Sequence, residues 1–221
     1  MNLGQLRDLE SLFVGDPNQT RFTAAQYKDA SNRAQEQFAF DTRSFFKDAP
    51  TYTVVDGTAA YALPEDFLWE KKVTHKGLKL EPISRETLEF YKRSDDWSDD
   101  SGTPKYYIID PEENRKTITL FPIPKSEDAG ANLIMTYYPI PTAMAADSDT
   151  PFNGYALLAP YHIAVAAYAA WLLTTYETQT PEVMAKRGAL NKVYQDKATE
   201  ATDHFKNTAS ESIRIRGGRT W

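Results

Sequence analysis

The chain has 221 residues, no Cys and a net charge of −6, with 31 acidic against 25 basic residues. The length suits one domain of ordinary size or a helical body with a smaller insert, and the lack of Cys excludes disulfides, thiolate zinc sites and cysteine nucleophiles. Such a chain fits synthesis in a reducing cytoplasm, and its negative charge disfavours tight wrapping around nucleic acid, because it repels phosphate.

The first predicted element is a helix that stops at Gly15. Its apolar residues recur at three- and four-residue steps: Leu3, Leu6, Leu9, Leu12 and Phe13. This spacing is typical of one face of a helix, and a Gly after the last periodic residue is a common stop.

The second predicted helix has a clear start. Thr23 and Gln26 have the spacing of a capping box, while Phe22 and Tyr27 have that of a hydrophobic staple. We expect the helix to end at Pro50, after an apolar stripe of Tyr27, Ala30, Ala34, Phe38 and Phe45.

Between residues 51 and 141 the apolar period changes to two, which indicates strands. TYTVV and AAYAL flank Asp56-Gly57 and predict a hairpin, and KKV and LKL predict a second one that turns near Gly77. A short helix is expected from Ser84 to Tyr91. Strands resume at KYYIID, TITLF and LIMTYYP, separated by turns at residues 111–114 and 125–130.

From Tyr155 the helical period returns with little polar face, so we expect a helix that is buried on most sides. The longest apolar run, Ile163 to Leu173, is too short for a membrane span, which needs about 20 residues, and no membrane association is expected. Thr180 and Pro181 then start a last, amphipathic helix that reaches Phe205.

The order of these elements predicts an α+β fold. A four-helix body is expected from residues 1–50 and 151–208, with an inserted antiparallel β domain at residues 51–150 and an extended C-terminal arm at residues 209–221.

The predicted arm differs in charge from the rest of the chain. It holds three Arg against one Glu, a net +2, which leaves −8 for the remainder. Apolar and basic residues alternate and a Trp follows, a pattern that suits addition to a partner's sheet edge or groove. The predicted partner-binding residues are Ile213, Arg214, Ile215, Arg216, Arg219 and Trp221. Disorder of the isolated terminus is the alternative.

Candidate metal ligands are few. His75, His162 and His204 lie far apart in sequence without ligand spacing, so we expect structural roles, with His162 in the core beside a hydrogen-bond partner. The acidic run from Asp95 to Asp100 is the best candidate calcium loop. It lacks the central Gly and terminal Glu of an EF-hand, so a solvated loop is expected, and no metal or cofactor is predicted.

No sequence feature predicts catalysis. Neither G-x-S-x-G nor G-x-x-x-x-G-K-[ST] occurs, and carboxylate pairs such as Glu65 and Asp66 are adjacent at turns, whereas glycosidase pairs face one another from separate segments. Lys105-Tyr106-Tyr107 has the composition of a base-stacking strand, but most aromatic residues are expected in the core or in subunit contacts. We expect a protein that is not an enzyme.

Several segments, in their order, resemble the head–tail adaptor proteins of tailed bacteriophages, especially the podovirus-type adaptor that seats the tail on the portal. The resemblance covers Leu3 to about Phe205. It rests on RFTAAQYKDASNRAQEQF, YTVVDGTAAYALPEDFLWEKKV, GTPKYYIID, TITLFPIP, and MTYYPIPTAM followed by DSDTPF.

The resemblance implies a structural subunit at the head–tail interface of the virion, made in the host cytoplasm. It implies a ring, commonly a dodecamer, between the portal protein and a tail or nozzle protein. Genomic DNA would pass through the central channel without sequence-specific binding, and an acidic lining would not hold it. A C-terminal arm would dock on the portal. The family supplies no catalytic residues and no cofactor.

Two other readings remain open from the residues alone. One is a carbohydrate- or calcium-binding module built on the β insert and the Asp95–Asp100 loop. The other is a hydrolase that uses scattered carboxylates, which would need a deep pocket with convergent acids of perturbed pKa.

Overall fold

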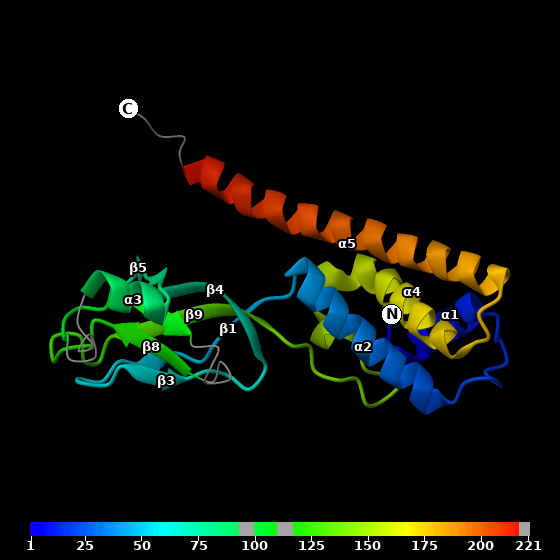
Figure 1. Cartoon of the computed structure of the whole chain (residues 1–221), viewed down its shortest axis with the longest axis horizontal. Helices are drawn as coiled ribbons and strands as arrows, with labels where there is room; N and C mark the ends of the chain where they lie inside the picture. Colours follow the sequence, from blue (N-terminus) through cyan, green and yellow to red (C-terminus); the bar gives the residue numbers. More distant parts are fainter. Residues whose placement is uncertain (93–99, 110–116, 217–221) are drawn as a thin grey trace. The chain divides into compact units, whose positions relative to one another are not determined.

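The structure is a computed structural model that describes residues 1–92, 100–109 and 117–216, with the backbone alone at residues 91–92 and 207–216. Its helices and its two β-sheets confirm the α+β class. The chain divides into a helical unit, Met1–Phe45 with Ile140–Trp221, and a β unit, Phe46–Pro139 (Figure 1). The insert predicted at residues 51–150 overlaps this β unit.

The helical unit is built around one central helix. Its α-helices are α1 (Leu3–Val14), α2 (Ala24–Thr42), α4 (His162–Leu173) and α5 (Pro181–Arg216). Short 3-10 turns lie before and after α4, at η2 (Pro151–Gly154), η3 (Ala156–Tyr161) and η4 (Thr174–Tyr176). α4 packs against α1, α2 and α5, so the apolar stripes of these three helices share one core.

The predicted end of the first helix and the predicted start of the second are confirmed. α1 ends at Gly15, whose φ of 74° is left-handed and suits glycine. Thr23 and Gln26 form the capping box of α2, and the Phe22 and Tyr27 rings lie 5.9 Å apart, as the staple requires.

The predicted end of α2 is wrong. The helix stops at Thr42, where Arg43 adopts a left-handed φ of 47°, and does not continue to Pro50. Two residues of the intervening segment form β1 (Lys47–Asp48), which pairs with a distant strand. Sheet pairing therefore overrides the apolar spacing that predicted a helix through Phe45.

α4 is nearly free of exposed surface, as predicted. Its alanines are buried, and Val165 and Leu173 lie in the same core. It begins later than the Tyr155 prediction because the preceding segment forms η2 and η3, and Pro160 provides no N–H for a helical hydrogen bond. The segment Ala156–Tyr176 is long and apolar enough to cross a membrane, yet more than half of its apolar stretch is buried inside this unit.

α5 begins where predicted but ends later. Thr180 Oγ1 accepts from the N–H of Val183 at 3.3 Å, a cap for the helix that starts at Pro181. The helix continues to Arg216, a length of about 54 Å. The extended conformation predicted for residues 209–216 is therefore wrong. No Gly or Pro interrupts the chain between Phe205 and Gly217, so no residue there breaks the helix.

The β unit contains two sheets. Its strands are β1 (Lys47–Asp48), β2 (Tyr52–Thr53), β3 (Ala60–Ala62), β4 (Phe67–His75), β5 (Leu78–Lys79), β6 (Glu81–Pro82), β7 (Tyr106–Ile109), β8 (Thr117–Phe121) and β9 (Asn132–Pro139). The first sheet has the order β1-β9-β4-β5, with β2 also on β9, and the second has the order β3-β8-β7-β6. All pairings are antiparallel except β6 with β7, which is parallel.

One predicted hairpin is confirmed and one is wrong. β4 and β5 form a hairpin with positive φ at Lys76 and Gly77, the signature of a tight hairpin turn. By contrast, β2 pairs with β9 and β3 pairs with β8, so the strands on either side of Asp56-Gly57 belong to different sheets. Gly57 still makes a turn, with a φ of 71°.

The remaining β-unit predictions agree with the structure where it describes them. α3 (Arg85–Lys92) matches the short helix predicted there, and β7, β8 and β9 match the three later strands. The turn at residues 125–130 forms, with Asp128 N donating to Lys125 O at 2.8 Å. The turn predicted at residues 111–114 lies outside the described residues.

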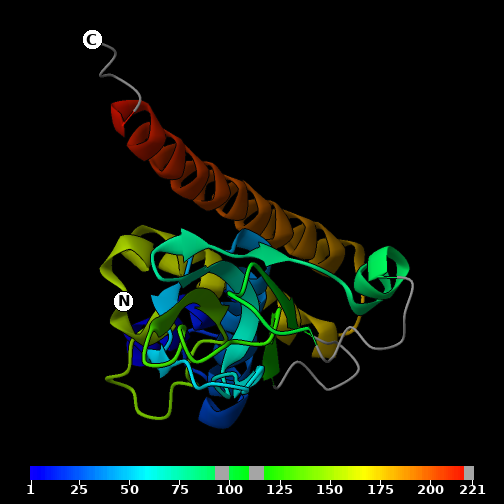
Figure 2. The same ribbon diagram turned by 90° about the vertical axis from the view of Figure 1, so that its left-hand side faces the viewer.

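The two sheets enclose the core of the β unit. Residues of the first sheet, such as Val73, Met135 and Tyr137, share a buried cluster with Ile118 and Leu120 of the second. α3 covers the other face of the second sheet through a small cluster of Leu88, Ile108 and Phe121 (Figure 2). Successive residues of β7 therefore point to opposite sides, Tyr107 toward the first sheet and Ile108 toward α3.

Candidate functional site

The helices of the helical unit are fixed to one another by buried polar contacts. Glu10 of α1 and Ser31 of α2 are both fully buried, and Ser31 Oγ donates to Glu10 Oε1 at 2.7 Å. Burial raises the pKa of Glu10 to about 8, against the lowering effects of Ser31 and Arg7. Glu10 is therefore neutral at pH 7, which removes the cost of a buried charge at this helix contact.

The loop between α1 and α2 is organised by Asp16. Its carboxylate accepts from the backbone N–H groups of Thr20 and Arg21 at 2.9 Å each, and from the hydroxyl of Tyr27 at 3.2 Å. Burial acts to raise the pKa of Asp16, but hydrogen bonds from Thr20, Arg21 and Phe22 outweigh it and lower the value to about 2. The loop thus has one well-defined conformation at neutral pH.

α5 is anchored along its first half. Lys186 Nζ donates to the carbonyl of Val14 at 3.0 Å, and Tyr194 donates to Asp41 of α2. The Tyr168 and Tyr194 rings lie 4.6 Å apart. The core contact of α5 extends as far as Ala201 and Phe205, after which the helix continues to Arg216.

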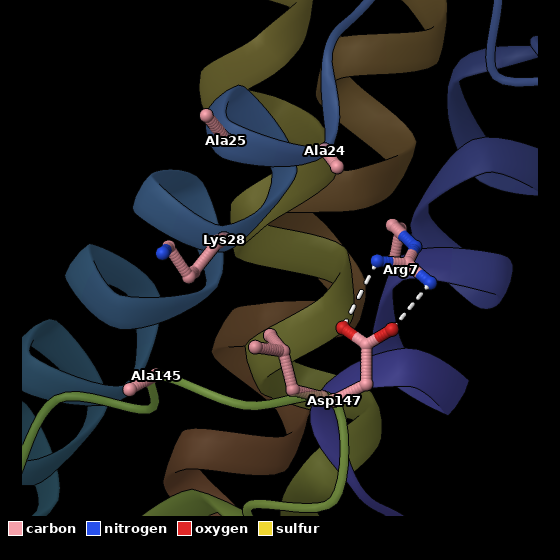
Figure 3. A pocket seen from close by; sticks show the side chains of 7 residues that line it. Arg7, Ala24, Ala25, Lys28, Ala145 and Asp147 are labelled. Atoms are coloured by element: carbon pink, nitrogen blue, oxygen red, sulfur yellow. Dashed lines mark hydrogen bonds and ion pairs between the residues drawn. The ribbon is translucent and has the colours of Figure 1, made fainter.

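A pocket of about 180 Å³ lies beside α1 and the start of α2 (Figure 3). Arg7 donates to both carboxylate oxygens of Asp147, at 3.0 and 2.9 Å, so its guanidinium is already paired. Lys28 points away from this pair (Figure 3). The Arg7–Asp147 pair therefore joins the loop after β9 to α1.

A second hollow on the helical unit, of about 140 Å³, lies between α2 and the end of α4. Tyr176 forms one wall with 71% of its surface exposed, and the ion pair of Asp29 and Arg33 lies along α2. Such an exposed aromatic side chain beside a shallow hollow suits contact with another protein better than enclosure of a substrate.

The β unit has a larger groove, of about 330 Å³. Its lining comes from both sheets and from the segment before α3: Trp69, Glu70, Pro82, Ile83, Ser84, Tyr107 and Ile109. Burial, and then the Glu70 carboxylate, raise the pKa of Tyr107 to about 12. The sequence patterns did not predict this groove, because β4 and β7 are more than thirty positions apart in the chain.

The three histidines lie apart, with different partners. His75 lies near Asp128 in the β unit, with 3.4 Å between Nε2 and Oδ1. His162 is buried in the helical unit with Nδ1 2.9 Å from the Met1 amine, and burial and that ammonium lower its pKa to about 4. His204 makes a hydrogen bond with the Tyr161 hydroxyl. Each has a hydrogen-bond partner, as a structural role requires.

The predicted calcium loop and arm are only partly within the described residues. Of the Asp95–Asp100 run, residues 95–99 lie outside them. Ile213, Arg214, Ile215 and Arg216 lie in the last turns of α5, where the backbone alone is described, and Arg219 and Trp221 lie outside. Among the described residues, no cluster of three or more His, Asp or Glu side chains could hold a metal ion.

A family model described as SU10 adaptor protein matches residues 1–216, nearly the whole chain. No curated protein matches the chain.

Proposed function

Since the chain belongs to the SU10 adaptor protein family, we propose that it is one subunit of a ring that joins the portal to the tail of a tailed phage. Family membership makes it a head–tail adaptor, a structural component of the virion that associates with portal and tail proteins. The proposal goes beyond family membership in three respects: the ring, the number of its subunits and its central channel.

The observation that supports a ring subunit is the construction of the helical unit. α4 is enclosed by three helices, a buried hydrogen bond joins α1 to α2, and a part-buried one joins α2 to α5. A closed ring needs each subunit to repeat the same two faces without deformation. A close-packed body of this kind provides faces of constant shape.

We further propose a dodecamer of podovirus type whose channel passes genomic DNA without sequence-specific binding. The net charge of −6 supports this, because a negatively charged lining repels the phosphate backbone during packaging and ejection. Synthesis in the host cytoplasm fits a chain without Cys.

The C-terminal segment is the proposed portal contact. The residues assigned to it are Ile213, Arg214, Ile215, Arg216, Arg219 and Trp221. α5 extends about 16 Å beyond Phe205, the last of its described core contacts, and so carries the part of this segment up to Arg216. The segment is basic, whereas the rest of the chain is acidic, so its preferred partner is an acidic groove.

Co-assembly tests both parts of this proposal. Purified protein is mixed with portal rings from the same genome and imaged, beside a truncated chain that ends at Thr208. We expect a ring of density on the portal with the full chain, and none with the truncated chain.

Three outcomes separate the claims. A ring that survives truncation keeps the connector and refutes the portal role of the C-terminal segment. A ring of other than twelve subunits refutes only the dodecamer. Failure of the full chain to bind the portal refutes the connector and favours the alternative of a carbohydrate- or calcium-binding module.

A further inference from the structure

The groove in the β unit contains a carboxylate that the fold does not use. Glu70 lies opposite Tyr137 in the β4–β9 register, and Tyr137 is buried on the inner face of its sheet. Directly opposed residues share a face, so Glu70 is directed between the sheets rather than toward solvent. Among the described residues it has no hydrogen-bond or ion-pair partner.

β4 is irregular on both sides of Trp69 and Glu70. The register of β4 against β9 shifts between Phe67 and Trp69 and again between Glu70 and Lys72. Trp69 and Glu70 both line the groove, together with Tyr107.

The rest of the groove lining named here is apolar or already hydrogen-bonded within the β unit. Pro82, Ile83 and Ile109 form apolar wall, and the hydroxyl of Ser84 is hydrogen-bonded to Thr87 N at 3.1 Å and to the Thr87 hydroxyl at 2.7 Å. A sugar would need several free polar groups around it. One half-buried carboxylate between aromatic and aliphatic walls instead suits a single cation with an apolar stem.

We propose that this groove binds an arginine side chain presented by a partner protein of the virion. The guanidinium would pair with Glu70 through two N–H groups, and its flat face would lie against the aromatic walls. The aliphatic stem would follow Ile83 and Ile109. Arginine is preferred to lysine because its planar guanidinium makes the forked carboxylate pair and stacks on rings together.

This inference goes beyond the connector proposal, since it concerns what one surface recognises whether or not a ring forms. It is testable with the full-length protein alone, so its failure would leave the portal experiment unaffected.

The probe is the peptide N-acetyl-Ile-Arg-Ile-amide, titrated into isotopically labelled protein and followed by NMR. The matched peptide carries citrulline, which has nearly the same shape as arginine without the charge. The protein variants are Glu70→Gln, which keeps the shape of the side chain, and Glu65→Gln, which removes an exposed carboxylate of the same unit that does not line the groove.

We expect shifts confined to the groove residues, and binding at least about tenfold weaker for the citrulline peptide and for E70Q, because a charge-assisted hydrogen bond is lost. E65Q should bind as the wild type does. The inference is overturned by no binding at millimolar peptide, by equal binding of the arginine and citrulline peptides, or by unchanged affinity in folded E70Q. Shifts in the same residues on addition of neutral sugars, without arginine dependence, would also overturn it.

Discussion

The hydroxyl of Ser31 donates to the carboxyl of Glu10 over 2.7 Å, and neither side chain has any exposed surface. A titratable group from α1 is thereby enclosed against α2. The contact is stable only while Glu10 is neutral, since an ionised carboxylate there would lack the water that stabilises its charge.

Glu10 should therefore make the helical unit sensitive to alkaline pH. Its pKa is about 8 in the folded protein and ordinarily 4.5. Between these values the folded state holds a proton that the unfolded state has released, so the free energy of unfolding falls as pH rises, and the loss is complete above about pH 8.

The substitution Glu10→Gln should remove that dependence and make the protein more stable than the wild type at pH 8.5, by roughly 2–4 kcal/mol. Urea unfolding of both proteins at pH 5.5 and 8.5 measures the effect. The test compares the free energy of unfolding of E10Q with that of the wild type at each pH. Titration of His162 also changes stability with pH, but it does so in both proteins and cancels in this difference. Glu36→Gln, on the exposed side of α2, is the control, and parallel pH curves for wild type and E10Q would contradict the argument.

The capping box of α2 gives a second prediction. Thr23→Ala removes the oxygen that accepts from Gln26 N at 3.3 Å, and should lower the free energy of unfolding by about 1 kcal/mol. Thr199→Ala, at an exposed position inside α5, should be neutral or slightly stabilising. Equal stabilities for T23A and the wild type in chemical denaturation would show that the cap does not contribute.

The close packing of α4 gives a third prediction. Ala167 is fully buried in the core of the helical unit, so a larger side chain must displace its neighbours. Ala167→Leu should cost about 1–3 kcal/mol of unfolding free energy. The same exchange at Ala185, on the exposed side of α5, should change stability by less than about 0.5 kcal/mol. Thermal unfolding distinguishes them, and a stable A167L would mean that the core around α4 is loosely packed.

A fourth prediction concerns two turns of the β unit. Lys76 Nζ donates to Asp128 Oδ1 at 2.7 Å and to the carbonyl of Glu127 at 2.8 Å, while Asp128 itself is fully buried. Burial acts to raise the pKa of Asp128, but Lys76 and His75 outweigh it, so the net pKa is lowered. Its contribution to stability is present at neutral pH and is lost on acidification.

Lys76→Met should destabilise the protein by about 1–3 kcal/mol at pH 7, because a buried carboxylate loses its main partner. The effect should shrink as pH falls and Asp128 takes up a proton. Lys79→Met, at an exposed position of β5, is the matched control. Unfolding curves at pH 7 and at pH 3, below the ordinary Asp pKa of 3.8, provide the test. A K76M deficit that grows in acid would refute the stated role of Lys76.

The features that the sequence predicted correctly depend on short-range chemistry. The Thr23 capping box, the Gly15 stop, the turn at Gly77 and the start at Thr180 each need only a few neighbouring residues. Their geometry is determined by backbone hydrogen bonds and by glycine's access to positive φ, which the local sequence specifies.

The errors arose where distant partners decide the structure. β2 and β3 flank a correct turn, yet each pairs with a strand more than fifty residues later in the chain. The groove of the β unit was missed for the same reason, since Glu70 and Tyr107 meet only after the two sheets pack. Period-two alternation in Ile213-Arg214-Ile215-Arg216 favoured a strand, but α5 continues through this segment.

Because the β unit is inserted between α2 and α4, the ribosome synthesises it after the first two helices and before the central helix of the helical unit. α1 and α2 emerge first, and roughly 120 residues follow before α4, a delay of roughly 6–24 s at about 5–20 residues per second. The β unit is contiguous in sequence and can complete its contacts within that interval. The apolar stripe of α2 must wait for α4, so a nascent chain arrested before Tyr161 would display that stripe to chaperones.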